Sequence, residues 1–316
     1  MVMRFEKPSD VKVLYLGTPK IAIYPLLALL EEGFNVVGVV TQADKPSGRS
    51  GELVASPVKK VALKAGVPVF QPVRIRKDYE WAKELGFDVI VCMAYGQIIP
   101  DELLEMAPLG AVNFHGSLLP KYRGAAPMQR ALMDGESETG VSLMEMVSKM
   151  DAGQVYETSV IPLDNVSNYS ELYEKMGAAA GEMAKHAIFK YVNGELKGVP
   201  QDESKVSFAE KISVEDEHLP LNLGARGTIN YIRGLSYEPG AYLYLGDKKL
   251  KVFKASLLSE ETAHDVGEII QNKKLLLLQL KDGVISLDEI QLEGKKMMAG
   301  GAFLNGARLT FPCYLK

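Results

Sequence analysis

The sequence predicts an α/β fold in which a doubly wound, mostly parallel sheet is followed by a C-terminal β-barrel. Over residues 11–192, short apolar runs alternate with segments of helical length, a pattern typical of parallel sheets with helices on both faces. Beyond residue 208, short β-like runs recur, which predicts a mainly antiparallel barrel. Residues 193–208 are polar and contain glycine and proline, as linkers do. We therefore expect a first domain over residues 1–192 and a second over residues 209–316.

The first domain reads as alternating strands and helices. The run at 11–19 is a buried strand that leads into a loop, and the segment at 22–33 is a helix closed by Gly33. Ser56 and Pro57 suit the cap and the first turn of the next helix. Further strands are expected at 34–42, 67–72 and 88–94, two more around a turn at 139–163, and further helices at 56–66, 78–86 and 169–194. A Rossmann-like sheet of this kind places ligands beyond the carboxyl ends of its strands.

The second domain shows only short β-like runs. They lie at residues 240–246, 249–258, 266–271, 274–280 and 283–294. Runs of this length and spacing favour a small OB-like barrel over a helical domain.

Composition indicates a globular protein that is not a general nucleic-acid binder. Hydrophobic residues make up 47% of the 316 residues and charged residues 24%, the balance of a folded soluble protein. The formal net charge is −4, so any contact with RNA has to come from local basic patches.

Missing signals disfavour several cofactors and locations. The loop after the first strand lacks the GxGxxG pattern, so NAD is not expected, and no phosphate loop of the form GxxxxGK[ST] occurs. Cys92 and Cys313 lie far apart without zinc-binding spacing, so we expect no metal and two free thiols in a reducing compartment. The N-terminus lacks the apolar core of a signal peptide, and no run reaches membrane-spanning length. We therefore expect a cytoplasmic protein with no membrane partner.

Asn113 and His115 are the first candidates for chemistry. They end an apolar run, and because side chains of an extended chain alternate, both would point the same way. Asp151, within the sequence MDAGQ, is a third candidate, because a carboxylate near an imidazole favours the charged ring. An amide and an imidazolium can both donate to an oxygen that gains negative charge. Taken alone, His115 is also explained as a hydrogen-bonded interior residue, and Asp151 as a turn former.

This trio suits a carbonyl that passes through a tetrahedral intermediate. No serine stands in a GxSxG elbow, and Cys92 lies in an apolar strand-like run, so no side-chain nucleophile is evident. Direct transfer to an incoming amine is therefore favoured over an acyl-enzyme.

The ordered motifs resemble the methionyl-tRNA formyltransferase family. The stretch NFHGSLLPKYRGAAPMQRAL at 113–132, followed by ETGVSLMEM at 138–146 and MDAGQ at 150–154, is similar to the catalytic core of formyltransferases that use 10-formyltetrahydrofolate. The resemblance covers nearly the whole chain. It implies an enzyme that formylates the α-amino group of methionyl initiator tRNA, giving N-formylmethionyl-tRNA for translation initiation. It also implies that Asn113 and His115 stabilise the formyl oxygen while Asp151 orients or charges His115.

The resemblance also implies where the folate and the tRNA bind. The segment SLLP matches the family's tetrahydrofolate-binding segment, and the stretch at 93–100 resembles a wall of the folate pocket. The loop at 41–60 resembles the insertion that grips the acceptor end of the tRNA, and the C-terminal domain resembles the part that assists tRNA binding. The residues implied for folate are Ser117, Leu118, Leu119, Pro120, Met93, Tyr95 and Gly96, and those implied for tRNA are Arg49, Lys59, Lys248 and Lys249.

Two other functions stay open at this point. Formyltransferases that act on amino sugars resemble the same core, so an amino-sugar nucleotide is a second candidate acceptor. A folate- or RNA-binding module without turnover is the alternative outside enzymes, although such a module has little need for Asn113, His115 and Asp151 together. The resemblance further implies a monomer.

Overall fold

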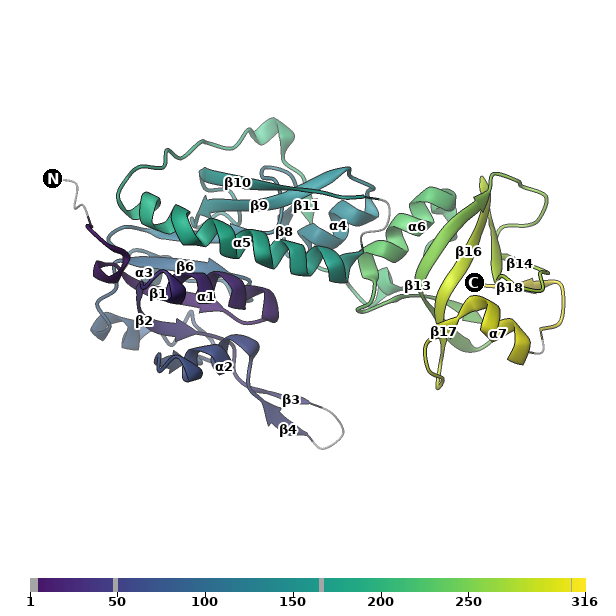
Figure 1. The fold of residues 1–316 in the computed structure, drawn as a ribbon, viewed down its shortest axis with the longest axis horizontal. Helices are drawn as coiled ribbons and strands as arrows, with labels where there is room; N and C mark the ends of the chain where they lie inside the picture. Colours follow the sequence, from purple (N-terminus) through teal and green to yellow (C-terminus); the bar gives the residue numbers. More distant parts are fainter. Residues whose placement is uncertain (1–4, 48–50, 165–167, 308) are drawn as a thin grey trace. The chain divides into compact units, whose positions relative to one another are not determined.

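The computed structural model describes residues 5–47, 51–164, 168–307 and 309–316, and Figure 1 draws its ribbon. The chain forms two compact units. The first comprises Met1–Gly124, Glu138–Pro162 and Tyr173–Phe208, and the second comprises Ala125–Ser137, Leu163–Leu172 and Ala209–Lys316. Because six segments alternate between the units, the chain passes from one unit to the other five times.

This division differs from the expected domain boundaries in three segments, one of which is Leu163–Leu172, expected in the first domain but part of the second unit. Residues 193–208, expected to be a linker, fold into the first unit. Helix α4 (Pro127–Met133), expected in the first domain, belongs to the second unit, where it packs against α6 (Gly224–Leu235). The two helices approach closely at Gly234, where a Cβ atom would lie 2.7 Å from Cγ of Met133. Helix α6 was not predicted, and its three glycines explain why, since glycine disfavours a helix interior.

The first unit is built on a sheet that contains, among the described residues, seven strands in the order β10-β9-β7-β6-β1-β2-β5. The five strands from β7 to β5 in this order pair in parallel, while β9 and β10 run antiparallel at one edge. This confirms the predicted mostly parallel sheet. The strands are β1 (Lys12–Gly17), β2 (Asn35–Val40), β5 (Val69–Phe70), β6 (Val89–Met93), β7 (Ala111–His115), β9 (Glu138–Glu145) and β10 (Val155–Pro162).

The helices of the first unit follow the predicted order with one exception. The Ser56 side chain accepts a hydrogen bond from the Lys59 N–H at 3.1 Å, which confirms the predicted cap of α2 (Pro57–Lys64). The exception is the helix predicted at 78–86, which is shorter than expected: residues 80–84 form the five-residue 3₁₀-helix η3 (Glu80–Glu84), too short for a run of i to i+4 hydrogen bonds. The others are η1 (Pro8–Asp10), η2 (Lys20–Ala22), α1 (Ile23–Glu31), α3 (Asp101–Leu104), α5 (Tyr169–Val192) and η4 (Glu203–Lys205).

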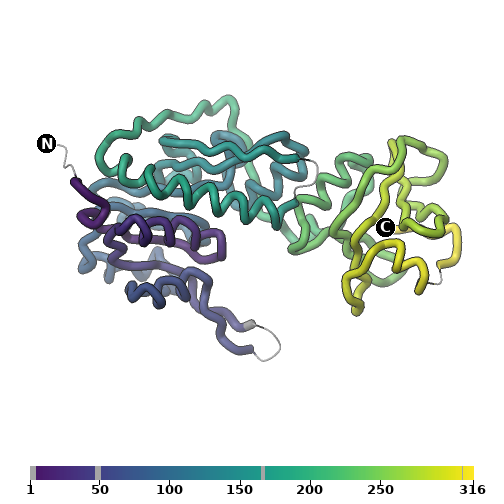
Figure 2. The backbone as a smooth tube through the Cα atoms, in the orientation of Figure 1, coloured from purple at the N-terminus to yellow at the C-terminus, as the bar shows by residue number. Residues whose placement is uncertain are grey.

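Most of the long helix α5 packs within the first unit. A Cβ atom at Gly177 would lie 2.5 Å from the Tyr24 ring, so this glycine lets α5 approach α1 closely. At the far end of α5, the Asn193 side chain accepts a hydrogen bond from the Phe5 N–H at 2.8 Å. Figure 2 shows the first described residues beside this end of the helix. These contacts fix the chain around the sheet that carries the candidate site.

The second unit contains a closed antiparallel barrel. Its strands lie in the order β12-β13-β16-β15-β14-β18, and a bridge between Leu245 and Leu315 joins the two ends of this order. This confirms the predicted barrel. Ile232 and Leu235 of α6 contribute to its buried core. The elements are η5 (Glu215–Glu217), η6 (Leu221–Leu223), β12 (Ala241–Leu245), β13 (Lys248–Ser259), β14 (Glu268–Ile270), β15 (Leu277–Leu280), β16 (Gly283–Leu292), β17 (Met298–Ala299), α7 (Gly300–Gly306) and β18 (Cys313–Tyr314).

A hairpin stands where the sequence suggested a loop. Strands β3 (Lys45–Ser47) and β4 (Glu52–Val54) pair in antiparallel fashion, with Pro46 opposite Leu53. Arg49, implied to grip the tRNA, lies outside the described residues. Within the described ranges, none of the helices combines the length and the apolar character needed to cross a membrane.

The two thiols are expected to differ sharply in reactivity. Both cysteines are free, but Cys92 is buried in β6 whereas Cys313 is half-buried. Burial raises the pKa of the Cys92 thiol to about 12, so only about one molecule in 10⁴ carries the reactive thiolate at pH 8. Titration of the native protein with a disulfide reagent at pH 8 should therefore label Cys313 and spare Cys92. The Cys313→Ser variant should be unreactive until it is unfolded, and rapid labelling of that variant in its native state would contradict the expectation.

Candidate active site

Strand β7 carries Asn113 and His115 to the carboxyl edge of the sheet. It pairs in parallel with β6, where Asn113 lies opposite Cys92, and in antiparallel fashion with β9, where His115 lies opposite Ser142. Neighbours on both sides therefore fix this strand in register. His115 is 6% exposed, and Asn113 is half-buried. Since they are two residues apart in a strand, their side chains leave the sheet on the same face.

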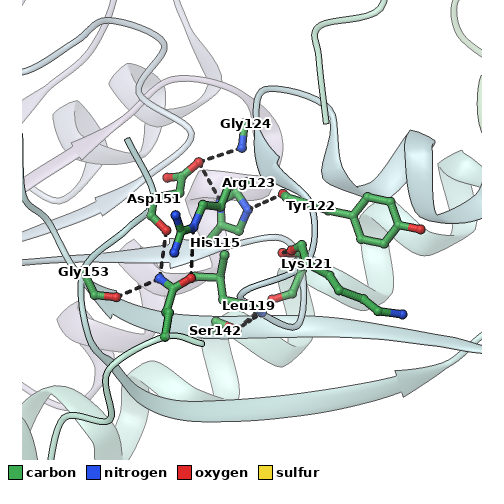
Figure 3. A network of polar contacts seen from close by, with 11 residues as sticks. His115, Leu119, Lys121, Tyr122, Arg123, Gly124, Ser142, Asp151 and Gly153 are labelled. Carbon is green, nitrogen blue, oxygen red and sulfur yellow. Dashed lines mark hydrogen bonds and ion pairs between the residues drawn. The ribbon is translucent and has the colours of Figure 1, made fainter. Parts of the chain in front are cut away.

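His115 lies between a backbone carbonyl and a carboxylate. Its Nε2 atom is 2.9 Å from the carbonyl oxygen of Tyr122, and its Nδ1 atom is 3.7 Å from Oδ2 of Asp151 (Figure 3). A carbonyl oxygen can only accept, so Nε2 carries the proton of this hydrogen bond. Nδ1 is then the ring nitrogen that remains for exchange with the carboxylate or with a bound molecule. The sequence predicted the pairing of His115 with Asp151, but not the carbonyl that fixes the ring.

The turn that carries Asp151 is held at three points. Asp151 has φ of 52°, a left-handed conformation that is uncommon outside glycine. Its Oδ2 atom accepts a hydrogen bond from the Gly124 N–H at 2.8 Å, and the Gln201 side chain donates to the Asp151 carbonyl at the same distance. A Cβ atom at Gly153 would lie 2.0 Å from the carbonyl oxygen of Glu145, so the turn presses against the end of β9. The carboxylate is thus presented to His115 by backbone geometry.

The loop after β7 is tied to β9 through one serine. The Ser142 hydroxyl donates to the Ser117 carbonyl at 2.7 Å and accepts from the Leu119 N–H at 3.1 Å. The Ser117 hydroxyl donates to the Lys121 carbonyl at 2.7 Å, which closes the loop on itself. Both serine side chains are buried, so the segment from Ser117 to Pro120 has a defined shape next to His115.

These groups suit polarisation of a carbonyl and transfer of a proton. An amide and an imidazole can donate to an oxygen that gains charge, and a carboxylate can stabilise the imidazolium. In the part of the chain that the structure describes, no group of three or more histidine, cysteine or acidic side chains is arranged to hold a metal ion.

Comparison with known proteins identifies the family. Residues 11–188 match the family model of formyl transferases, and residues 211–308 match that of the formyl transferase C-terminal domain. The methionyl-tRNA formyltransferase of Malacoplasma penetrans is 42% identical over 299 residues, which cover 94% of both chains. The chain belongs to the methionyl-tRNA formyltransferase family. A relative from Staphylococcus aureus with the same name is 38% identical over 303 residues, which cover 95% of this formyltransferase and 97% of the relative.

Solved structures with a similar fold include other formyl-transferring enzymes. An N-formyltransferase from Helicobacter canadensis, in complex with folinic acid and dTDP-3-aminofucose, superposes with a TM-score of 0.68 at 19% identity, over 88% of the present formyltransferase and 98% of that chain. HypX from Aquifex aeolicus, in complex with tetrahydrofolic acid, gives a TM-score of 0.63 at 17% identity, over 92% of this chain and 46% of that one. Both resemblances concern the fold.

Two of the three residues implied on the first wall of the folate pocket have buried side chains in this formyltransferase. Met93 and Tyr95 are each 2% exposed, and burial raises the pKa of the Tyr95 hydroxyl. The Tyr95 carbonyl accepts hydrogen bonds from Thr18 and Gln42. Gly96, by contrast, is exposed at φ of 88°. A ligand bound along residues 93–96 would therefore contact the backbone of this segment and Gly96, because the side chains of Met93 and Tyr95 are buried.

Leu119 and Pro120 of the SLLP segment line a cleft within the first unit. The cleft has a volume of about 360 Å³. The Leu118 side chain is directed toward β9 instead. Its Cδ2 atom lies 2.7 Å from the position that a Cβ atom would take at Gly140. Other lining residues come from β10 and from the segment after α5: Val155, Tyr156, Glu157, Thr158, Val199, Pro200, Gln201 and Asp202.

The lysines implied in tRNA binding have different surroundings. Lys59 donates to Asp44 at 2.6 Å and to Gln71 at 2.7 Å, so much of its charge is neutralised within the formyltransferase. Lys249 places its ammonium 4.0 Å from the centroid of the Tyr242 ring in the second unit. Lys248 is exposed at the start of β13. Of these lysines, Lys248 has the side chain best placed to meet a phosphate.

Sequence reasoning missed the residues that hold the site from outside the motifs. Tyr122 contributes only its carbonyl, and Gly124 only its N–H, which no residue-type pattern records. Arg123 and Gln201 lie behind the Asp151 turn, and Gln201 stands in the segment that was expected to be a linker. A polar residue in a linker carries no periodic signal, so only the position of Arg123 within the motif could have pointed to this network.

Proposed function

We propose that this formyltransferase moves the formyl group of 10-formyltetrahydrofolate to the α-amino group of methionyl initiator tRNA. Methionyl-tRNA is supported as the acceptor by the sequence identity of 38% to 42%, over nearly the whole chain, to relatives named methionyl-tRNA formyltransferase. The sugar N-formyltransferases with a similar fold are only 17% to 20% identical. An amino-sugar nucleotide is therefore the weaker candidate acceptor.

Asn113 and His115 would stabilise the formyl oxygen. As the carbonyl becomes tetrahedral, its oxygen gains negative charge that an amide N–H and an imidazolium N–H can both meet. The Tyr122 carbonyl occupies Nε2 of His115 at 2.9 Å, so Nδ1 would be the nitrogen that reaches the reacting group. The half-buried Asn113 leaves part of its side chain open to a bound molecule.

Asp151 would keep His115 oriented and assist the movement of protons. The attacking amine has to be neutral and the leaving nitrogen has to gain a proton, so the reaction needs a group that shuttles between two protonation states. Oδ2 of Asp151 lies 3.7 Å from Nδ1 of His115, an ion-pair distance, so a proton would pass between them once the two side chains approach to hydrogen-bond distance, while Nε2 keeps its bond to Tyr122. The carboxylate would stabilise the ring in its charged state.

The residues around the site fit a flat folate with a polar edge. Leu119 and Pro120 offer apolar contact in a cleft that is also lined by polar side chains, and the loop between Ser117 and Lys121 is held in a fixed shape. Exposed Gly96 offers its backbone beside the Gln42 side chain, whose Nε2 atom lies 2.2 Å from the position that a Cβ atom of Gly96 would take. A heteroaromatic ligand is commonly bound by such a mixture of apolar contact and backbone hydrogen bonds. The folate would supply the formyl group as a substrate.

A single-turnover assay tests this proposal. The purified protein is mixed with labelled 10-formyltetrahydrofolate and, in separate reactions, with methionyl initiator tRNA, uncharged tRNA or an amino-sugar nucleotide. We expect label to move only to the charged tRNA. Transfer to the sugar would support the other acceptor, and tight folate binding without any transfer would support a binding module.

Lys248 is expected to contribute to the salt dependence of tRNA use. A lysine that neutralises one phosphate releases about one counterion, so Lys248→Ala should reduce the slope of log kcat/KM against log salt by about 1. Its effect on the KM for folate should be negligible. Lys83→Ala is the matched control, because Lys83 is an exposed lysine already paired with Glu80. Equal slopes for Lys248→Ala and the parent protein would remove the residue from the interface.

A monomeric state and a cytoplasmic location stay predictions. Sedimentation equilibrium at micromolar concentration tests the first, and fractionation of cells that produce the protein tests the second.

A further inference from the structure

Two residues with strained backbone, Tyr122 and Asp151, determine the geometry of the His115–Asp151 pair. Tyr122, whose carbonyl binds His115, has φ of 59°, and Asp151 has φ of 52°. Both are non-glycine residues in the left-handed region, where side chains crowd the backbone. Such conformations persist only where surrounding contacts determine them. The contacts that hold these two positions therefore control the geometry of the pair.

One side chain links both positions. The Nε2 atom of Gln201 donates to the carbonyls of Asp151 at 2.8 Å and Gly153 at 2.7 Å, and its Oε1 atom accepts from Nε of Arg123 at 3.0 Å. Arg123 lies between Tyr122 and Gly124, the two residues whose backbone contacts His115 and Asp151 (Figure 3). Gln201 thus joins the chain on either side of the pair through three hydrogen bonds.

The segment after α5 makes further contacts with strand β8 (Arg123–Gly124) and with Tyr122, the residue that precedes it. Ser207 accepts from the Tyr122 N–H through its hydroxyl and from the Arg123 N–H through its carbonyl, both at 2.9 Å. Glu203 accepts from Nη2 of Arg123 at 2.8 Å and from Lys149 at 3.0 Å. These partners belong to the first unit.

The surroundings of Arg123 are not those of a residue that only stabilises the fold. The side chain is 1% exposed, and within the described ranges its Nη1 atom has no hydrogen-bond partner. A buried charge with an unsatisfied donor is usually a worse choice for stability than an apolar residue of similar size. A guanidinium does, however, fix the direction of each partner that it binds.

We propose that Gln201 and Arg123 are positioning residues, which hold the Asp151 turn and the segment from Tyr122 to Gly124 so that Asp151 faces His115. This inference rests on the proposed role of Asp151 in formyl transfer. Neither side chain contacts the reacting atoms, and both act through the backbone of residues that do. Residues 199–207 are then a part of the active site rather than a linker.

The variant Gln201→Glu separates positioning from packing. It keeps the length of the side chain and its bond to Arg123, but a carboxylate cannot donate to the carbonyls of Asp151 and Gly153. We expect kcat to fall about tenfold to a hundredfold, since a displacement near 1 Å has an effect of that size. The KM for tRNA should change by less than about twofold, whereas the KM for folate should rise, because Gln201 also lines the cleft of Leu119 and Pro120. A kcat within about twofold of the parent value would overturn the inference.

Two further variants keep the test decisive. Arg123→Lys retains the charge but loses the Nε donor to Gln201, so kcat should fall by about tenfold with unchanged KM values, and an unchanged kcat would count against the inference. Gln279→Glu in the barrel is the control, because Gln279 likewise donates to buried carbonyls, those of Leu280 and Gly283. Its melting temperature should fall while kcat holds. An equal loss of kcat in this control would assign the effect of Gln201→Glu to general destabilisation and overturn the inference.

A double-mutant cycle distinguishes this inference from the proposed function. If Gln201 acts through Asp151, then adding Gln201→Glu to Asp151→Asn should lower kcat by less than about twofold beyond Asp151→Asn alone. Full additivity would mean that Gln201 acts elsewhere. An Asp151→Asn variant with full activity would instead refute the role of Asp151 itself, whatever Gln201 does.

Discussion

Replacing His115 by alanine is expected to lower kcat by about 10²- to 10⁴-fold, the range typical of a lost general acid or base. The ring occupies a buried site between the Tyr122 carbonyl and the Asp151 carboxylate, and no other histidine among the described residues lies against that carboxylate. Alanine removes both proton-bearing nitrogens at once. Steady-state kinetics with saturating folate and charged tRNA measure the loss.

The control for this variant is His264→Ala. His264 also faces a carboxylate, with Nδ1 at 3.1 Å from Glu268, but it belongs to the second unit. Its kcat should stay within about twofold of the parent value. If His115→Ala kept more than about a tenth of the parent kcat, His115 would be a structural residue and the proposed proton transfer would need another group.

Replacing Asn113 by alanine is expected to lower kcat by about 10²- to 10³-fold, or about 3 to 4 kcal/mol of transition-state stabilisation, as for other donors to a developing oxyanion. The KM values for folate and tRNA should change little, because the charge on the oxygen grows only as the amine attacks. The fold should persist, since β7 is paired on both sides and Asn113 is half-buried. Kinetics and a thermal melt on the same preparation check both statements.

Asn113→Asp sharpens this test. Aspartate has nearly the same shape as asparagine but offers only acceptors when it is ionised, so it would repel the oxygen that Asn113 is proposed to stabilise. Its kcat should be no higher than that of Asn113→Ala. A more active aspartate variant would show that the size of the side chain, and not its N–H group, is what the reaction needs.

Much of the sheet and the shared direction of Asn113 and His115 could be predicted because their signals are local or periodic. The alternation of apolar runs with helical segments gave the parallel sheet, and the spacing of Asn113 and His115 placed both on one face of β7. The pairing of His115 with Asp151 came from the resemblance, since nothing in the spacing of 36 residues between them requires a contact.

The features that escaped prediction depend on contacts between distant segments. The left-handed conformations of Tyr122 and Asp151 leave no mark in a pattern of residue types, and Gln201 meets Asp151 across 50 positions of the chain. Lys59 looked free in the sequence because its partner, Asp44, lies 15 positions away in the loop between β2 and β3. Helix α6 depends on its packing against α4, which overrides the low helix propensity of its glycines.

The five crossings between units mean that neither half of this protein can be cut out as a module. A fragment starting at Ala209 would contain every strand of the barrel but would lack α4. The face of α6 that contains Gly234, which α4 covers in the whole protein, would then be exposed to solvent. Grafting the barrel onto another enzyme would therefore require carrying along residues 125–137, which follow the catalytic motif directly in the chain. Residues 125–137 are thus part of the barrel's own unit, although they adjoin the catalytic motif in the chain.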